Sequence, residues 1–292
     1  MFIATLVAER LAPGQLSDAA DRLAALHCAP GEMRWLDQGR AADLHFAAHP
    51  DLARGALEGA FAKTDVLIQP AANREKKLLV ADMDSTMITV ECIDELADYA
   101  GIKAQIAEVT ERAMRGELDF GAALDARLAL LEGLEESAID RCLAERVRNS
   151  PGAEILVKTM AARGATTVLV SGGFTRFAGP VGERLGFQRV IANVLEIADA
   201  KLTGTVTKPI VDSATKETTL LAVREELGLS PEQTLAVGDG ANDLAMIRQA
   251  GLGVAYRAKP IVAAAAGARV DHTDLTTLLY AQGIKRAEWV AG

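Results

Sequence analysis

The sequence predicts an α/β protein, in which a doubly wound parallel sheet carries a helical insertion and follows a small α+β domain. Three observations support this prediction. Strand-like and helix-like segments alternate from residue 151 onwards, and residues 89–150 are rich in helix-forming residues throughout. Residues 1–73 form a separate pattern of short strands and helices. We therefore expect two domains, 1–73 and 74–292.

The first domain is predicted to have the order βαββαβ. Ser17 or Asp18 is expected to cap a helix that runs to His27, and a second helix is expected over 51–62. This order resembles that of ACT domains, which often bind amino acids, so an amino-acid ligand here stays open. A polar stretch with an early proline, 69–77, marks the expected domain boundary. The strands are expected over 2–7, 33–37, 42–48 and 65–69.

Composition excludes several classes of protein. The net charge of −9 argues against a general binder of nucleic-acid backbones. The three cysteines are odd in number and scattered, which favours neither disulfides nor a zinc site. The start, MFIATLVAERLAP, lacks the basic region of a signal peptide, and no apolar run reaches membrane-spanning length. We expect a cytoplasmic protein without a membrane partner, and a homodimer stays open.

Two carboxylates follow the first strand of the predicted parallel sheet. The run 78–81, LLVA, is typical of a strand that is buried on both faces, and Asp82 and Asp84 come directly after it. Ligands bind at the carboxyl ends of parallel strands. The pair is therefore placed where it could hold a cation.

Three further polar groups are expected at the same edge of the sheet. Ser171 and two glycines follow the strand TTVLV, Asp239 opens GDGAND after the strand TLAVG, and Lys216 begins the helix between them. Together with Asp82 and Asp84, these groups supply a nucleophile, an acid, a metal site, a cation and donors to phosphate. Phosphoryl transfer needs this set.

The motifs DMDST, VSGGF, a later lysine and GDGAND resemble, in this order, those of the haloacid dehalogenase-like (HAD) phosphatases. The spacing and the insertion are similar to the phosphoserine phosphatases within that family, over about residues 78–260. The resemblance implies a HAD core formed by 74–88 and 151–292, with a helical cap over 89–150. It also implies Mg²⁺-dependent hydrolysis of O-phosphoserine in serine biosynthesis.

The resemblance assigns the reaction to two aspartates and the metal to three. Asp82 would attack phosphorus and become an aspartyl phosphate, although an aspartate after a strand is also common in plain turns. Asp84 would protonate the leaving serine oxygen and bind Mg²⁺ through its backbone carbonyl only. Asp239 would complete the Mg²⁺ site with Asp82. Asp243 would support the site, or would only stabilise the start of a helix.

The substrate contacts are also taken from the resemblance. Ser171, the Gly172 amide and Lys216 would hold the phosphate. In the cap, the spacing of Phe120, Leu124, Arg127 and Leu131 predicts one stripe of a helix, from which an arginine could also simply reach water. The phosphoserine phosphatase pattern implies that Arg127 binds the substrate carboxylate and Glu91 its ammonium group. It adds Asn242 as a substrate contact, and Met114 and Phe120 as apolar walls.

Two alternatives remain at this point. A HAD enzyme could act on another small phosphate, or pass the phosphoryl group to an alcohol such as homoserine. The chain could instead be an amino-acid-binding regulator whose phosphatase half is vestigial, although both expected catalytic aspartates are present. His45 and His49 have helical spacing but lie in a strand-like context before Pro50, so we expect no metal pair there.

Overall fold

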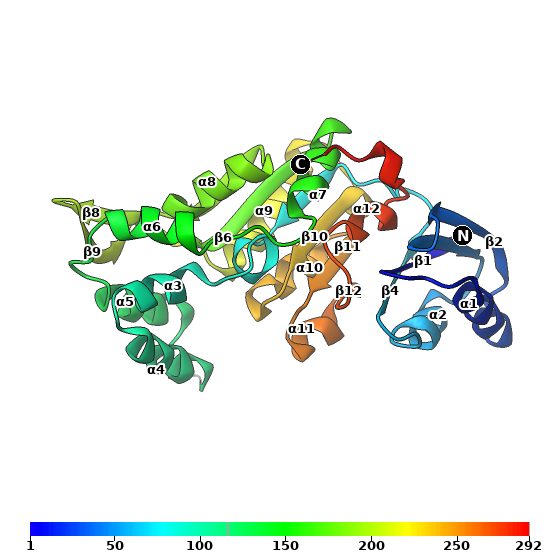
Figure 1. The fold of residues 1–292 in the computed structure, drawn as a ribbon, viewed down its shortest axis with the longest axis horizontal. Helices are drawn as coiled ribbons and strands as arrows, with labels where there is room; N and C mark the ends of the chain where they lie inside the picture. The colour runs from blue at the N-terminus through cyan, green and yellow to red at the C-terminus, as the bar shows by residue number, and fades with distance from the viewer. Residues whose placement is uncertain (116, 292) are drawn as a thin grey trace.

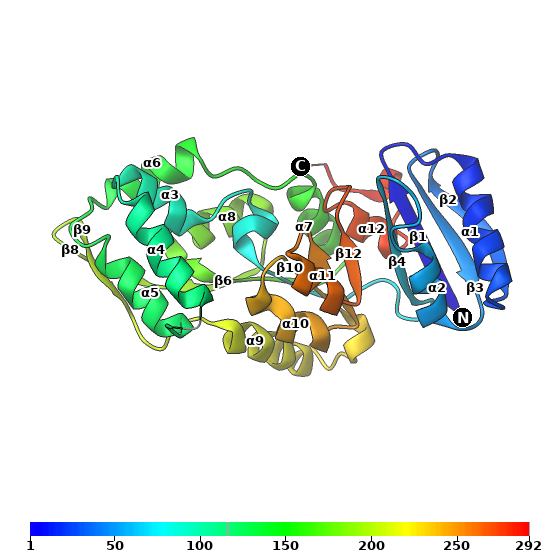
Figure 2. The same ribbon diagram turned by 90° about the horizontal axis from the view of Figure 1, so that it is seen from below.

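The chain folds into three parts that lie in a row (Figures 1 and 2). The computed structural model describes residues 1–115 and 117–291, apart from the side chain of Met114. A central α/β core lies between the N-terminal domain at one end and a helical cap at the other. The predicted fold class is confirmed, because the core contains the parallel sheet and the N-terminal part contains a separate antiparallel one.

The core is built on a six-stranded parallel sheet with the order β12-β11-β10-β5-β6-β7. The first strand in sequence, β5, lies in the middle, with β6 on one side and β10 on the other. The chain therefore changes direction across the sheet at β5, and such a switch point is where open α/β sheets bind ligands. The strands are β5 (Leu78–Ala81), β6 (Thr166–Phe174), β7 (Arg189–Asn193), β10 (Thr234–Gly238), β11 (Leu252–Tyr256) and β12 (Ala268–Val270).

Helices cover both faces of this sheet because successive strand residues point to opposite sides. Leu79 and Ala81 of β5 belong to the apolar cluster beneath α7 and α8, whereas Leu78 and Val80 belong to the cluster beneath α9. All four side chains are fully buried, as the LLVA run predicted. The core helices are α7 (Ala153–Ala162), α8 (Thr175–Leu185), α9 (Ser213–Glu226), α10 (Leu244–Gln249), α11 (Pro260–Ala265) and α12 (Thr277–Ala281).

The cap between β5 and α7 contains four helices. The turns after the first and the third of these four contain Gly101 and Gly133, whose positive φ angles of 71° and 80° suit glycine. The helices are α3 (Cys92–Tyr99), α4 (Lys103–Met114), α5 (Phe120–Ala129) and α6 (Ser137–Glu145).

A hairpin from the core chain joins the cap. The sequence predicts a hairpin over 190–206, but residues up to Asn193 belong to β7 of the sheet, and the hairpin begins later with β8 (Leu195–Ala198) and β9 (Lys201–Val206). Backbone N–H groups of Gly133 and Glu136 donate to carbonyls of Leu202 and Ala200, both at 2.8 Å. The cap is thus fastened to the core chain at a second place.

The N-terminal domain has the predicted βαββαβ order, with the strands arranged β2-β3-β1-β4. The predicted start of its first helix is wrong: α1 begins at Pro13, where the ring presets φ and the Gln15 side chain accepts from the Ala12 N–H at 2.9 Å. The second helix, α2, ends at Leu57, before Gly59 with φ of 71°. The elements are β1 (Phe2–Ala8), α1 (Pro13–Ala25), β2 (Pro30–Asp37), β3 (Ala41–Phe46), α2 (Pro50–Leu57) and β4 (Thr64–Pro70).

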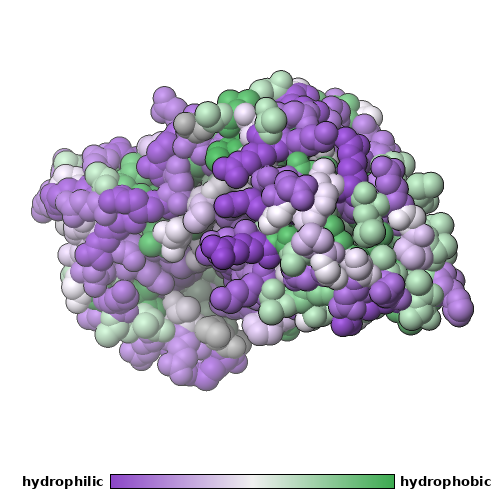
Figure 3. Space-filling model, turned by 45° about the vertical axis from the view of Figure 1, so that its right-hand side comes forward, coloured by the Kyte–Doolittle hydropathy of each residue, from purple (hydrophilic) through white to green (hydrophobic). Residues whose placement is uncertain are grey.

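The surface is mainly polar on the face that Figure 3 presents. Hydrophilic residues cover most of this face, and hydrophobic residues lie between them in separate small groups. Among the helices in the described residues, none is both long enough and apolar enough to cross a membrane.

Candidate active site

The polar groups that the sequence places after separate strands line one pocket at the carboxyl edge of the sheet. Asp82 follows β5, Asp239 follows β10, and Ser171 lies in the last part of β6. The pocket has a volume of about 440 Å³ and is closed on its far side by cap residues. The parallel sheet therefore brings together, at the carboxyl ends of its strands, side chains that are up to 157 residues apart in the sequence, from Asp82 to Asp239.

The turn after β5 points Asp82 and Asp84 in different directions. The Asp82 carboxylate accepts from the Met83 N–H at 2.8 Å. The chain then reverses through Ser85, whose φ of 56° is unusual for a residue with a side chain. Asp84 accepts instead from the Cys92 N–H at 3.2 Å, at the start of α3. One carboxylate thus belongs to the sheet edge and the other to the entrance of the cap.

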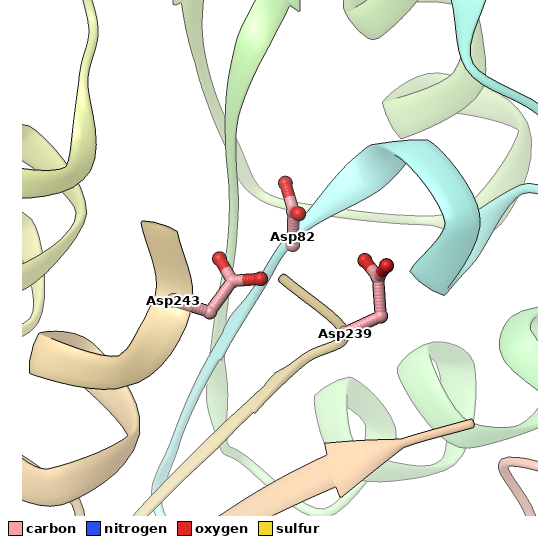
Figure 4. Close-up of side chains that lie close together, drawn as sticks. All are labelled: Asp82, Asp239 and Asp243. Atoms are coloured by element: carbon pink, nitrogen blue, oxygen red, sulfur yellow. The ribbon is translucent and has the colours of Figure 1, made fainter. Parts of the chain in front are cut away.

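Three carboxylates converge on one position (Figure 4). Asp82, Asp239 and Asp243 each offer an oxygen, and these oxygens all lie within 4.8 Å of one another. The Thr86 hydroxyl donates to Asp239 at 3.1 Å and holds this side chain towards the group. The Asp84 side chain does not belong to this group.

Lys216 is buried between two of these carboxylates. Its Nζ lies 2.6 Å from Asp82 Oδ1 and 2.6 Å from Asp243 Oδ1, and only 1% of the residue is exposed. The other oxygen of Asp243 accepts the Gly240 N–H at 3.0 Å. Asp243 therefore joins Lys216 to the loop that carries Asp239.

Burial is the first cause of the pKa shifts of Asp82, Asp84 and Asp239. It raises the pKa of Asp82, and the Lys216 ammonium opposes this rise. It raises the pKa of Asp84 to about 7, with the Glu91 charge as the next cause, and that of Asp239 to about 6, where Asp243 adds to the effect. Burial acts to lower the pKa of Lys216, but the Asp82 and Asp243 carboxylates outweigh it and the pKa rises.

The donor set fits a hard divalent cation. Three carboxylates face one ammonium group, so the group carries excess negative charge. Carboxylate oxygens are the ligands that such cations prefer, and no described histidine or cysteine belongs to the group. The acidic group is therefore a metal-compatible site.

The phosphate side of the pocket is formed by the end of β6. Ser171 is 1% exposed, and its hydroxyl oxygen accepts the Gly173 N–H at 2.9 Å, which leaves the hydroxyl proton available to a ligand. The Asn193 side chain donates to the Gly172 carbonyl at 2.8 Å and fixes the loop. A Cβ on Gly173 would lie 2.8 Å from Asp84 Oδ2, so only glycine fits beside the acid.

The cap contributes the opposite wall. Glu91, Phe120, Leu124 and Arg127 line the pocket, and Arg127 is held by its Nε, which donates to the Ala123 carbonyl at 3.2 Å. Leu131, the last member of the predicted stripe, is buried but lies beyond the end of α5. The Glu91 carboxylate accepts from the Ser85 hydroxyl at 2.6 Å, which ties it to the turn after Asp84.

Of the other predicted substrate contacts, the structure describes the side chain of Asn242 but not that of Met114. Asn242 lines the pocket, and its backbone carbonyl accepts from the Ser213 hydroxyl at 2.8 Å. The Met114 side chain lies outside the described residues, as does Gly116. Sequence reasoning missed Lys259, Asp94 and Thr110, which also line the pocket. Lys259 could have been found, because it follows β11 and so lies at the same sheet edge as the aspartates.

Comparison with known proteins identifies the family. The sequence profile of the haloacid dehalogenase-like hydrolases matches residues 79–248. The chain belongs to the haloacid dehalogenase-like hydrolases. This match spans β5 to α10, and the strand ends that carry Asp82, Ser171 and Asp239 lie within it.

Several relatives of this HAD-like hydrolase are named phosphoserine phosphatases. A phosphoserine phosphatase of Streptomyces coelicolor is 46% identical over 80% of the chain and 57% of its own length. One from Albidiferax ferrireducens is 46% identical over 70% of the chain and 88% of its length. A crystal structure of a probable phosphoserine phosphatase from Vibrio cholerae has a TM-score of 0.77 at 35% identity and covers 97% of the chain and 88% of its own. The chain spans little more than half the length of the Streptomyces relative.

Proposed function

We propose that the chain hydrolyses O-phosphoserine to serine and phosphate through an aspartyl phosphate on Asp82. The observation that carries the proposal is that groups suited to phosphate at the sheet edge face two oppositely charged side chains on the cap. Asp82, Ser171 and Lys216 gather around a position for phosphate, and Arg127 and Glu91 offer opposite charges on the cap wall. A phosphorylated amino acid carries the three matching charges. The names of the relatives support the same substrate.

In the first step, an Asp82 carboxylate oxygen attacks phosphorus and the bond from phosphorus to the serine oxygen breaks. Lys216 and the Met83 N–H hold the carboxylate in position. Asp84 gives its proton to the leaving serine oxygen, since an alkoxide would leave poorly. The raised pKa of Asp84 suits a carboxyl group that begins the reaction protonated.

In the second step, a water molecule attacks the phosphorus of the aspartyl phosphate. Asp84, now ionised, takes a proton from this water, and the bond between Asp82 and phosphorus breaks. Phosphate leaves, and both aspartates return to their starting states. The Ser171 hydroxyl and the Gly172 N–H hold the phosphate oxygens in both steps, and Lys216 compensates their charge.

The metal is proposed to be Mg²⁺, held by Asp82, Asp239 and the backbone carbonyl of Asp84. When bound, it compensates the negative charge of the phosphate and carboxylates. Both Asp243 oxygens already accept from donors, Lys216 and the Gly240 N–H, so Asp243 is proposed to support the site from behind the ligands.

The domain division at 73/74, with the cap over 89–150, is part of this proposal. The N-terminal domain has an apolar cluster formed by its own residues, which supports the division. The ACT-like character of residues 1–73, an amino-acid ligand there, a homodimer and a cytoplasmic location stay predictions.

The decisive experiment measures phosphate release from phosphoserine, phosphothreonine and sugar phosphates, with magnesium and with a chelator. We expect magnesium-dependent release that favours phosphoserine, and its loss in Asp82→Asn with the fold retained by circular dichroism. Asp21→Asn, on the exposed side of α1, is the matched control. More than a trace of activity in Asp82→Asn would refute the nucleophile, and equal turnover of sugar phosphates would refute the substrate.

A second arm separates hydrolysis from transfer. Homoserine is added to the reaction, and its phosphate is sought by ³¹P NMR. Formation of homoserine phosphate in preference to inorganic phosphate would make the enzyme a phosphotransferase. Serine binding to the N-terminal domain, with no phosphate release from any amino-acid phosphate, would favour the regulator.

A further inference from the structure

A second cavity lies between the N-terminal domain and the core, away from the acidic group. Its volume is about 420 Å³, close to that of the active-site pocket. Glu9 and Arg40 of the N-terminal domain line it on one side, and the loop 272–277 with the C-terminal residues Arg286 and Trp289 lines it on the other. In Figures 1 and 2 the C-terminal segment, drawn in red, lies between the core and the blue N-terminal domain.

Arginines outnumber carboxylates among the residues that line this cavity. Three guanidinium groups line it, those of Arg40, Arg257 and Arg286, against the carboxylates of Glu9 and Asp274. Asp274 is already engaged by the backbone N–H and the hydroxyl of Thr276.

The arginines themselves are only weakly engaged. Among the described residues, no carboxylate forms an ion pair with Arg40 or Arg257, and Arg286 has one at 3.7 Å, with Asp37. Arg257 donates to the Thr273 carbonyl at 3.2 Å and stacks over the Tyr256 ring at 5.3 Å, so its side chain is placed without being neutralised. Its backbone has a φ of 46°, a left-handed conformation that is uncommon outside glycine.

One wall of the cavity is apolar. Tyr280 and Trp289 form an aromatic pair with ring centroids 4.9 Å apart, and both line the cavity together with Ile155 and Val7. Guanidinium groups beside an aromatic wall suit a ligand that has both an anionic group and an apolar body.

We propose that this cavity binds a small organic anion, a carboxylate or phosphate attached to an apolar body, and that binding is transmitted to the active site. Arg257 lines the interdomain cavity, and Lys259, two residues later, lines the active-site pocket. A ligand that draws the Arg257 guanidinium inwards therefore acts on the segment that presents Lys259 to the substrate. Binding itself is independent of the proposed function, whereas the kinetic consequence rests on it.

The binding test uses isothermal titration calorimetry of the full chain with two probes, phenylacetate and phenylphosphonate, which distinguish a carboxylate from a phosphate site. We expect one of them to bind, and the double variant Arg40→Gln/Arg257→Gln to weaken it at least tenfold. Arg127→Met, in the active-site pocket, and Arg34→Gln, an exposed arginine on β2, should bind as the unmodified chain does. Arg34, Arg40 and Arg257 are exposed, so we expect their substitutions to leave the melting temperature unchanged.

Failure of both probes to bind at millimolar concentration would overturn the site. So would binding that survives in the double variant, or that is lost equally in Arg34→Gln. The bound probe should change KM for phosphoserine at least twofold in the unmodified chain and leave it unchanged in the double variant. Probe binding without any change in KM or kcat would overturn the connection through Arg257 and Lys259, and the site itself would stand.

Discussion

The Lys216 ammonium lies 2.6 Å from the Asp243 carboxylate, and the two side chains are 1% and 0% exposed. We propose that Asp243 positions the lysine that faces Asp82. Replacing it by asparagine keeps the shape and leaves Lys216 with one anionic partner. We expect Asp243→Asn to lower kcat about 10–100-fold and to weaken magnesium binding, as loss of a partner behind a metal site usually does.

The measurement compares kcat, KM and the magnesium concentration for half-maximal rate. A change in the melting temperature alone, with kcat and magnesium dependence unaltered, would contradict the positioning role. Asp243→Glu provides a second test, because glutamate keeps the negative charge but has a longer side chain. This variant should therefore recover activity only in part.

The sequence was sufficient to place Asp82, Ser171 and Asp239 together, because a parallel sheet brings strand ends to one edge regardless of their separation in the chain. It could not give the contact between Lys216 and Asp243. That contact depends on the packing of α9 against the loop after β10, which no local pattern encodes. Lys259, by contrast, follows β11, which lies one strand beyond β10 from the switch point, so the same rule about strand ends could have found it.

The expectations based on helix-capping residues and on turn residues were wrong at two places. Ser17 and Asp18 are good capping residues, yet α1 begins at Pro13, because the Gln15 side chain accepts from the N–H of Ala12, the N-cap residue, five residues before Ser17. The hairpin after β7 was placed too early, since Arg189–Asn193 complete the parallel sheet by pairing with β6. Tertiary pairing outweighed the turn signals in that case.

Arg127 gives a test of substrate recognition. Its guanidinium lines the pocket near the charges of Asp94 and Glu91, and burial lowers its pKa while these two carboxylates oppose the shift. If it binds the substrate carboxylate, Arg127→Met should raise KM for phosphoserine about 10–100-fold, the value of one charge-assisted pair of about 1.5–3 kcal/mol.

The control for this variant is an aryl phosphate that has no carboxylate, such as p-nitrophenyl phosphate. Its KM should be nearly unchanged in Arg127→Met, because the phosphate side of the pocket is intact. An equal rise for both substrates would mean that Arg127 shapes the cap and does not select the carboxylate.

The cysteines give a pH-dependent prediction. Burial, with Glu95 as the next cause, raises the pKa of Cys142 to about 11, and burial raises that of Cys28. An unperturbed thiol with a pKa of about 8.5 is roughly one quarter ionised at pH 8, whereas one with a pKa of 11 is about 0.1% ionised. The native chain should therefore react very slowly with a disulfide reagent at pH 8, and guanidinium should expose all three thiols.

The same shift links stability to pH. Between about pH 8.5 and 11 the unfolded Cys142 thiol loses its proton while the native one keeps it. Unfolding then releases protons, so this group lowers the free energy of unfolding as pH rises through that window. Urea midpoints at pH 8 and pH 10, for the unmodified chain and Cys142→Ala, measure the effect. An equal pH dependence in the two proteins would refute it.

Arg74 connects the N-terminal domain to the core through a buried ion pair. It binds both carboxylate oxygens of Asp43, at 2.6 and 2.7 Å, and its Nε donates to the Ala281 carbonyl at 2.7 Å. Asp43 is 1% exposed. Arg74→Met would leave that charge buried without its partner, so we expect a loss of about 3–5 kcal/mol in stability.

Thermal unfolding of Arg74→Met should show this loss as a fall of roughly 6–20 °C in the melting temperature. Arg22→Met is the matched control, because Arg22 forms an exposed pair with Asp18 at 3.2 Å and should cost less than about 1 kcal/mol. The double variant Arg74→Met/Asp43→Leu should recover much of the loss, since removing both charges also removes the unpaired one. A single variant that melts with the unmodified chain would show that the pair does not hold the domains together.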